Sequence, residues 1–533
     1  MKQITSTILL FSLVFISPAR AQEPVDQGVI ARIKTEGFQH SQVMETMFYL
    51  TDVHGPRLRG SPNYKSAAEW TVRTLNGWGL SNAQLEPGGY TGRGWTVNRF
   101  SLEMIEPQYF HLIAYPLAWS PATKGAISGQ PIIVDINSPD DFAKYRGKLR
   151  GAIVLLGKTA AKPAAHFEAD ARRFTDEELK RGAGAISPQD KILEEYDGPG
   201  YAQSEKARRE GLARRAVLSK FFVDEGVAAL LRPSPLDSAN LLVTDAGGFD
   251  LNSPNYKLPV PELAVPSFAL AREHYGRIYR LLQHGIPVRL EVNLQVTIHD
   301  AGPGYNVVAE LPGVDPRLKD ELVMLGGHFD SWHAGTGATD NAAGSAVMME
   351  AMRILKAIGV RPRRTIRLAL WDGEEGGHLG SSAYVKSHFG DPATMKLKPD
   401  HEKLAGYFNL DNGTGKIRGV YLQGNEAVRP IFEKWLQPFH YLGATTLAIQ
   451  SVGGTDHLDF DHVGLPGFQF IQDPIDYETR THHTNLDVYE SILPDDLKQA
   501  AVIVASFVYN TAMRDEKLPR KALPKVQPQS DDR

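Results

Sequence analysis

The chain has 533 residues, of which 42% are hydrophobic and 23% charged, with a formal net charge of −4 and no cysteine. The small net charge gives no support for binding to nucleic acid or an anionic membrane surface, and the lack of cysteine excludes disulfides and thiolate metal sites. The length allows two or more domains, and any bound metal would need His and carboxylate ligands, which are typical of catalytic sites.

The first 21 residues have the pattern of a secretory signal peptide. Lys2 precedes a mostly apolar stretch at 4–16, and residues 19–21 form the small-residue motif Ala-Arg-Ala of a cleavage site. The apolar stretch is shorter than the roughly 20 residues that span a bilayer, so an uncleaved interfacial anchor is the less favoured alternative. We therefore predict export to the periplasm or the medium, with Gln22 as the first mature residue and no stable membrane insertion.

Residues 22–109 are predicted to begin a first domain. Apolar residues at helical spacing predict helices at 24–50 and from Asn63 to about Gly77, separated by a loop rich in Gly and Pro at 54–62. Residues 83–104 are then typical of strand.

Residues 110–300 are predicted to form an inserted, β-rich domain. Alternating apolar residues at 288–298 predict a half-buried strand, and a charged stretch at about 158–215 predicts exposed helices joined by loose linkers. Further short strands are predicted at 131–134, 151–156, 227–231 and 265–270.

After residue 301 predicted strands alternate with predicted helices. This alternation favours an α/β fold with a mixed, mainly parallel sheet that has helices on both faces. Residues 22–109 and 301–515 would be two parts of this one domain, and 516–533 would be a disordered tail. Strands are predicted at 306–311, 322–325, 365–370 and 404–410, and helices at 341–358 and 495–513.

Clusters of His, Asp and Glu follow these predicted strands or precede the last helix. Open α/β sheets place their active sites at the carboxyl ends of strands, so we expect the clusters to meet there. Taken singly, each cluster is more typical of a polar loop, a solvated face or a turn, but their recurrence in order favours a metal site. The residues concerned are His328, Asp330, His333, Asp340, Glu374, Glu375, Asp411, His482 and His483.

A set of two histidines and three carboxylates suits two zinc ions that share one carboxylate and one water. A further glutamate beside them could take the proton of that water and pass it to a leaving amine. The residues therefore predict metal-assisted hydrolysis.

Five motifs resemble those of the co-catalytic di-zinc exopeptidases of metallopeptidase family twenty-eight, which include aminopeptidases and glutamate carboxypeptidases. The resemblance extends to 55–62, to 305–313 and to a protease-associated domain inserted at about 110–300. It implies the zinc exopeptidase fold and two Zn²⁺ per chain. The five motifs lie at 327–330, 339–344, 371–381, 409–411 and 483–487.

The resemblance also implies a role for each site residue. Asp340 would bridge the two zinc ions. His328 and Asp411 would complete the site of one, and Glu375 and His483 the site of the other. Between His482 and His483 the family pattern favours His483, because its ligand directly precedes Thr or Ser.

Two further residues gain catalytic roles from the resemblance. Glu374 would be the general base, and Asp330 would orient the ring of His328. The family also has a cis peptide bond at the position of Asp340–Asn341. His333 and His378 match no ligand position and are expected to be loop residues.

The substrate pocket is expected between residues 411 and 483. Asp456 could bind a peptide amine, Arg480 a carboxylate, and Tyr477 could donate to the oxyanion, although each is equally typical of ordinary loop structure.

The prediction is an exported di-zinc exopeptidase that cleaves dipeptides or the terminal bonds of peptides, with a homodimer as a possible assembly. Whether it acts from the amino or the carboxyl end is left open by the sequence. Two alternatives share the fold: a mono-zinc acyl transferase of the glutaminyl cyclase kind, and a catalytically inactive receptor or binding protein. Both are disfavoured because the ligand set for two metals is complete.

Overall fold

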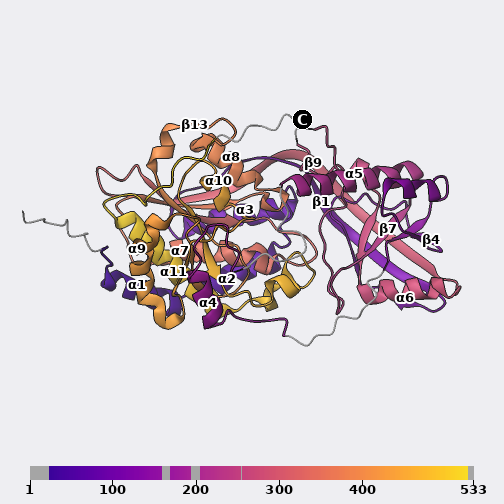
Figure 1. Ribbon diagram of the computed structural model, residues 1–533, viewed down its shortest axis with the longest axis horizontal. Coiled ribbons are helices and arrows are strands. Elements are labelled where there is room, and N and C mark those ends of the chain that lie inside the picture. Colours follow the sequence, from indigo (N-terminus) through magenta and orange to yellow (C-terminus); the bar gives the residue numbers. More distant parts are fainter. Residues whose placement is uncertain (1–22, 159–168, 194–204, 254, 526–533) are drawn as a thin grey trace, which may run out of the picture.

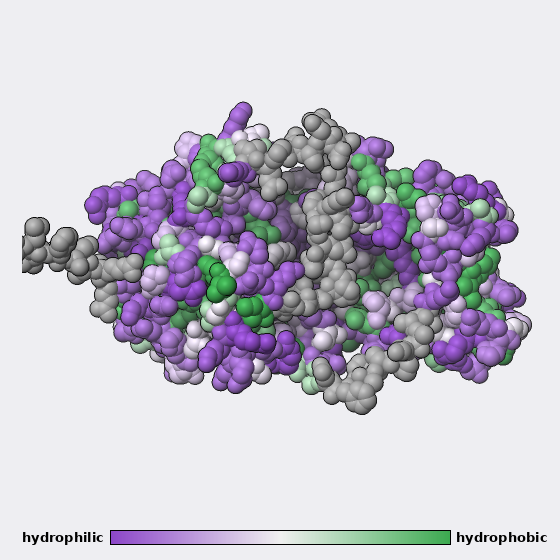
Figure 2. Space-filling model, in the orientation of Figure 1, coloured by the Kyte–Doolittle hydropathy of each residue, from purple (hydrophilic) through white to green (hydrophobic). Residues whose placement is uncertain are grey.

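The computed structural model describes residues 23–158, 169–193, 205–253 and 255–525, so the predicted signal peptide lies outside the described residues. Figure 1 shows a larger lobe that contains α1, α7, α9 and α11, and a smaller lobe that contains α5, α6, β4 and β7. Within the described residues, no helix is both long enough and apolar enough to cross a membrane. Figure 2 shows a mainly hydrophilic surface on this side of the larger lobe, with hydrophobic residues in small groups.

A ten-stranded mixed sheet forms the centre of the larger lobe and has a parallel core, as the alternation of strands and helices predicted. The predicted strands of the second half appear as β10, β11 and β14 and as the end of β9, whereas β15, β16 and β17 were not predicted. The main path runs β16 (Thr446–Ala448), β15 (Ile417–Tyr421), β17 (Gly467–Gln472), β14 (Leu404–Asn409), β10 (Leu322–His328), β11 (Thr365–Trp371), β9 (Arg289–Leu311), β1 (Ser81–Glu106) and β2 (Phe110–His111), and β4 (Ile127–Gly129) pairs with β9.

Helices cover both faces of this sheet. On one face the hydrophobic core includes α7 (Ala343–Ala357), which is buried along almost its whole length because it packs on the sheet and against α11 (Pro494–Met513), α1 (Gln27–Gln39) and α2 (Val43–Phe48). The same face holds α3 (Pro62–Gly77) and α9 (Arg429–Leu436). The other face holds α8 (Leu379–His388) and α10 (His457–Asp461). The single helix expected at 24–50 is divided into α1 and α2.

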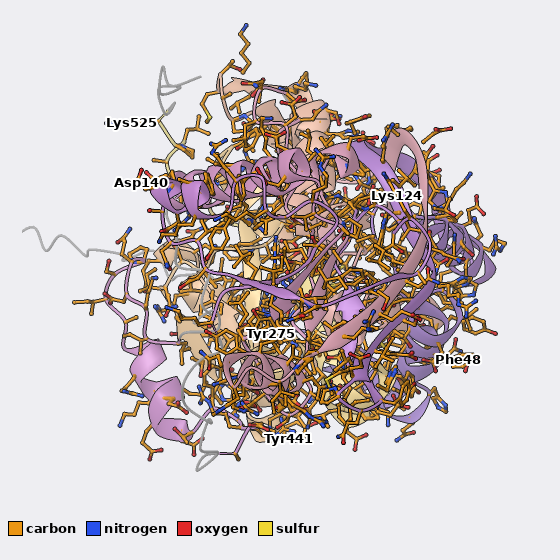
Figure 3. The ribbon with its side chains drawn as sticks, turned by 90° about the vertical axis from the view of Figure 1, so that its right-hand side faces the viewer. Phe48, Lys124, Asp140, Tyr275, Tyr441 and Lys525 are labelled. Carbon is orange, nitrogen blue, oxygen red and sulfur yellow. The ribbon has the colours of Figure 1, made fainter. Side chains whose placement is uncertain are left out.

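The smaller lobe is built on a second, five-stranded sheet. α6 (Arg272–Gln283) packs on it with the outer parts of β1 and β9, and α5 (Glu205–Glu225) contributes Phe221 and Phe222 to a separate core. Figure 3 looks onto this end of the molecule and labels Tyr275 of α6. The sheet runs β3 (Ala114–Pro116), β8 (Ser267–Leu270), β7 (Ala229–Pro233), β6 (Ile153–Leu156) and β5 (Ile132–Val134).

Two long antiparallel strands join the lobes. β1 and β9 pair from Ser81 with Glu310 to Glu106 with Arg289, through several register shifts. Their inner ends belong to the large sheet, and their outer ends pack on the smaller lobe. The predicted limit at 110 falls just past the outer end of β1, whereas the predicted limit at 300 falls in the middle of β9.

Residues 169–193 differ from the exposed, loosely linked helices that their charge predicted. Phe174, Leu179 and Leu193 pack into a hydrophobic cluster of the larger lobe, beside the edge strand β16. Arg173 pairs with Asp473 at 2.8 Å and with Asp496 at 2.6 Å. This segment includes α4 (Asp176–Ala183). Its apolar residues are spaced among the charged ones, so one side of the segment is buried and the charged side chains stay at the surface.

The predicted disordered tail is ordered over its described part, 516–525. Leu518 is 2% exposed in the core of the larger lobe. The Arg520 guanidinium donates to the backbone oxygens of His401 and Leu404 at 2.9 and 3.0 Å. The polar composition of this segment predicted disorder, but the single apolar side chain of Leu518 and the donor groups of Arg520 hold it against the larger lobe. Residues 526–533 lie outside the described part of the chain.

Candidate active site

The predicted site residues gather at the carboxyl ends of neighbouring parallel strands. His328 ends β10, Glu374 and Glu375 follow β11 in a short 3₁₀ turn (Glu374–Gly376), and Asp411 follows β14. Because parallel strands end at the same edge of a sheet, these side chains meet although up to 83 residues separate them in sequence.

One group of potential ligands surrounds His328. Its Nε2 lies 3.1 Å from Oδ1 of Asp340 and 3.1 Å from Oδ1 of Asp411. All three residues are buried, and their facing atoms lie within 4.8 Å of one another.

A second group surrounds His483. Its Nε2 lies 3.1 Å from Oδ2 of Asp340 and 3.0 Å from Oε2 of Glu375. His482 is more distant, with Nε2 3.9 Å from Oδ2 of Asp340, and its Nδ1 faces Glu478 at 3.4 Å. The distances therefore favour His483 over His482, although His482 also falls within 4.8 Å of Asp340 and His483.

This donor set fits zinc. Ligand atoms that each lie about 2.0–2.2 Å from a tetrahedral ion are separated by roughly 3.3–3.6 Å, close to the contacts of 3.0–3.1 Å measured here. Oε1 of Glu375 is buried without a hydrogen-bond partner among the described residues. Buried carboxylate oxygens without donors are costly, and a cation would remove that cost.

Asp340 is held by its neighbours in sequence and in space. The peptide bond to Asn341 is cis, as the family resemblance implied. The carboxylate of Asp487 accepts from the backbone nitrogens of Thr339 at 2.6 Å and Asp340 at 3.2 Å. Asp487 was not predicted to have a role, although its place in the last motif, four residues after His483, was a signal for one.

Asp330 contacts both halves of the site. Its Oδ1 lies 3.5 Å from Nδ1 of His328 and accepts from the backbone nitrogen of Glu374 at 3.1 Å. The backbone oxygen of Asp330 is also 3.1 Å from Nδ1 of His328. Asp330 is therefore placed to fix the ring of His328 and the start of the turn that carries Glu374.

His378 was expected to be an ordinary loop residue, but it lies against Glu374. Its Nε2 is 3.3 Å from Oε1 of Glu374, and its Nδ1 is 3.4 Å from Oδ2 of Asp459. The hydroxyl oxygen of Ser381 lies 2.8 Å from the same oxygen of Asp459. The local signal was the spacing of four residues between Glu374 and His378, which suits contact across one turn. His333, by contrast, is buried against the backbone oxygen of Pro116 at 2.8 Å, as a structural residue.

Burial and crowding shift the ionisation of the site. Burial lowers the pKa of His328, but Asp411, Asp330 and Asp340 outweigh burial and hold that pKa well above its usual value. Burial raises the pKa of Glu375 to about 8, and it also raises the pKa of Glu374. Perturbed carboxyls in a cleft are typical of catalytic sites.

A cleft of about 510 Å³ opens beside these residues and reaches the smaller lobe. None of the three predicted substrate contacts lines it. Asp456 is fully buried and accepts from Ser381 at 2.5 Å, Tyr477 stacks on His482, and Arg480 is half exposed and 3.8 Å from Asp476. Their assignment to substrate stays a prediction. The lining includes the acidic and histidine residues Glu374, Glu375, His378, His483 and Asp245, together with Arg59, Trp332, Arg215 and Lys257.

Known proteins with similar sequences are peptidases. Peptidase family M28 matches residues 306–508. Carboxypeptidase Q of Homo sapiens is 25% identical over 499 residues, which cover 92% of this chain and 89% of that protein. Aminopeptidase YwaD of Bacillus subtilis is 32% identical over 213 residues, which cover 38% of this chain and 43% of that protein.

Solved structures share the fold. A peptidase M28 precursor from Shewanella amazonensis aligns with a TM-score of 0.67 at 24% identity, over 94% of this chain and 99% of that chain. BSAP, a zinc aminopeptidase from Bacillus subtilis, aligns with a TM-score of 0.54 at 19% identity, over 89% of this chain and 95% of that chain. These matches and the donor set at the strand ends support a zinc metallopeptidase with a peptidase family M28 domain at residues 306–508.

Proposed function

We propose that the protein is an exported di-zinc exopeptidase that hydrolyses dipeptides or the terminal bonds of peptides. One observation carries this proposal: the two carboxylate oxygens of Asp340 face different histidines. Oδ1 lies 3.1 Å from Nε2 of His328, and Oδ2 lies 3.1 Å from Nε2 of His483. A carboxylate between two ligand groups is the arrangement that a pair of metal ions requires.

Asp340 would therefore bridge two zinc ions, with His328 and Asp411 on one side and Glu375 and His483 on the other. Zinc bound there would supply Lewis acidity, which lowers the pKa of a water molecule and polarises the peptide carbonyl. The remaining chemistry belongs to the protein.

Glu374 would act as general base. Its carboxylate lines the cleft, takes a proton from the attacking water, and gives a proton to the amine that leaves. His378 contacts the carboxylate of Glu374, and Asp330 accepts from its backbone nitrogen, so both would hold this base in place. Asp330 would also orient the ring of His328.

The inserted lobe and the location of the enzyme complete the proposal. We assign the lobe within 110–300 as a protease-associated domain, with the catalytic domain in 22–109 and 301–515. The signal-like pattern at 1–21 would direct the enzyme to the periplasm or the medium, and a homodimer is the proposed assembly.

A panel of short peptides with free and blocked ends tests the function. The zinc-loaded protein should cleave dipeptides or terminal bonds and lose activity on chelation, and blocking one end should reveal the direction of attack. Conversion of amino-terminal glutamine to pyroglutamate, without peptide cleavage, would support the cyclase alternative instead. Zinc binding with no turnover on any peptide would support a receptor.

A further inference from the structure

Arg59 lies in the wall of the cleft and is 3% exposed. No described residue accepts a hydrogen bond from its Nε. The guanidinium lies over the ring of Trp119, 4.7 Å from the ring centre. A guanidinium has five N–H donors, so burying one without acceptors is costly unless a bound molecule supplies them.

Arg57, two residues earlier in the same loop, shows how this protein satisfies a buried guanidinium. Arg57 is fully buried, and its side chain donates to four backbone oxygens at 2.8–3.0 Å. Those oxygens belong to Leu50, Phe329, Thr336 and Gly337. The unmet donor of Arg59 is therefore not a general property of the loop.

Trp332 contributes a second unmet donor to the same wall. Its indole Nε1 is buried without a hydrogen-bond partner among the described residues, and the residue lines the cleft. Trp332 packs edge-on against Trp119, with ring centres 6.2 Å apart, and against His483 at 5.9 Å. Arg59, Trp119 and Trp332 thus form one donor wall that reaches the second ligand group.

The donor wall also lies directly beside Glu375. A side chain carbon placed on Gly376 would come within 1.9 Å of Nη1 of Arg59, so the guanidinium packs on the residue that follows the proposed ligand. An acceptor bound by Arg59 would therefore lie close to the bond that is cleaved. A carboxylate is that close when only one or two residues of the substrate follow the cleaved bond.

The other cations of the cleft have acceptors within the protein. Arg215 of α5 pairs with Asp245 at 3.6 Å, and Lys257 contacts the backbone oxygen of Gly377 at 3.4 Å. Both contribute positive charge to the cleft from the smaller lobe. Arg59 differs from them because it combines near-complete burial with an unmet donor.

We propose that Arg59, together with the indole N–H of Trp332, binds a carboxylate of the peptide substrate and so determines specificity. The inference rests on the proposed peptidase function and deepens it. Guanidinium and carboxylate match in shape and charge, which favours this acceptor over a neutral carbonyl. The carboxylate could be the carboxyl terminus of the peptide or an acidic side chain next to the cleaved bond.

Four substrates separate these two sources. Steady-state kcat/KM is measured for Ala-Ala, Ala-Ala-amide, Ala-Glu-amide and Ala-Gln-amide with the zinc-loaded wild type, Arg59→Met and Arg59→Lys. If the terminal carboxylate is bound, the ratio of Ala-Ala to Ala-Ala-amide should be about 10- to 100-fold in the wild type and approach one in Arg59→Met. If an acidic side chain is bound, the wild-type preference should appear instead in the kcat/KM ratio of Ala-Glu-amide to Ala-Gln-amide, and this ratio should approach one in Arg59→Met.

Arg59→Lys tests whether the positive charge alone is sufficient. It retains the charge near the acidic residues but lacks the planar fork, so the carboxylate preference should fall to an intermediate value. The matched control is Arg232→Met, because Arg232 also has an Nε without a partner among the described residues but does not line the cleft. This control should keep the wild-type ratios, and circular dichroism should show that all variants are folded.

Two results would overturn the inference: wild-type ratios near one for both pairs, or ratios that survive in Arg59→Met. If the wild type cleaves none of the peptides, the function proposal fails by itself. Calorimetric titration with N-acetylalanine and N-acetylalanine amide then decides the inference. Tighter binding of the acid that Arg59→Met abolishes supports the carboxylate site, and equal binding of acid and amide overturns it.

Discussion

The two walls of the cleft satisfy their buried polar groups in different ways. We call the two ligand groups, which reach the cleft through Glu375 and His483, the ligand wall; there Asp340 faces His328 and His483 at 3.1 Å, and Glu375 faces His483 at 3.0 Å. On the donor wall, Arg59 and Trp332 have buried N–H groups without acceptors among the described residues. On our proposals, bound cations would complete the first arrangement and a bound substrate would complete the second. We therefore expect changes in the ligand wall to affect catalysis and changes in the donor wall to affect the choice of substrate.

Glu374→Gln should have the largest effect, because it removes the proposed proton acceptor on the ligand wall. We expect kcat to fall about 10²- to 10⁴-fold while the zinc content is unchanged. Turnover is measured beside metal analysis, with Glu177→Gln on the exposed surface of α4 as control. An active Glu374→Gln enzyme would remove Glu374 from the mechanism.

The two arginines of one loop should differ in their effect on stability. Arg57→Met should lower the free energy of unfolding by about 3–5 kcal/mol, because four buried backbone oxygens lose their donor. Arg59→Met should change that free energy by less than about 1 kcal/mol, since Nε donates to no described residue. Urea unfolding followed by tryptophan fluorescence measures both. Equal losses would show that Arg59 is also structural.

His333 should make the stability depend on pH. Burial lowers the pKa of His333 to about 4 from its ordinary 6.5, although the backbone oxygen of Pro116 opposes this. Between these values the unfolded chain binds a proton that the folded chain does not, so stability falls as the pH falls from 6.5 to 4. The loss is on the order of 3 kcal/mol.

His333→Phe should reduce that loss, as measured by unfolding at pH 7 and pH 4.5. His284→Phe, at an exposed position, serves as control and should keep the wild-type dependence. An unchanged pH dependence in His333→Phe would show that the imidazole is not buried in its neutral form.

His378→Gln should have a smaller effect on catalysis than Glu374→Gln. The variant loses the contact of 3.3 Å to Oε1 of Glu374 but keeps the base itself. We expect kcat to fall about 10- to 100-fold with the zinc content unchanged. Loss of zinc, or wild-type kcat, would each refute a role in holding Glu374.

Most of the ligand wall was accessible to sequence analysis because its parts follow predicted strands, whereas His483 was identified by its place before the last helix. His328, Glu375 and Asp411 come after β-like apolar runs, and parallel strands bring their carboxyl ends together. The α/β fold with its mainly parallel sheet is confirmed on the same basis. The roles of the individual ligands stay predictions.

The donor wall was not accessible in this way. Arg59, Trp119 and Trp332 come from separate segments, and only tertiary packing brings them together. Carboxylate binding was predicted for Arg480 instead, which is half exposed and does not line the cleft. No local pattern distinguishes Arg57, whose side chain has four backbone acceptors, from Arg59, whose buried Nε has none among the described residues.

The central claim is that Asp340 serves two metal ions. Zinc per chain, measured by atomic absorption after dialysis against metal-free buffer, tests it most directly. The account predicts about two zinc ions in the wild type and nearly none in Asp340→Ala, because both ligand groups lose a shared member. One zinc ion in the wild type, or loss of only one in Asp340→Ala, would contradict it.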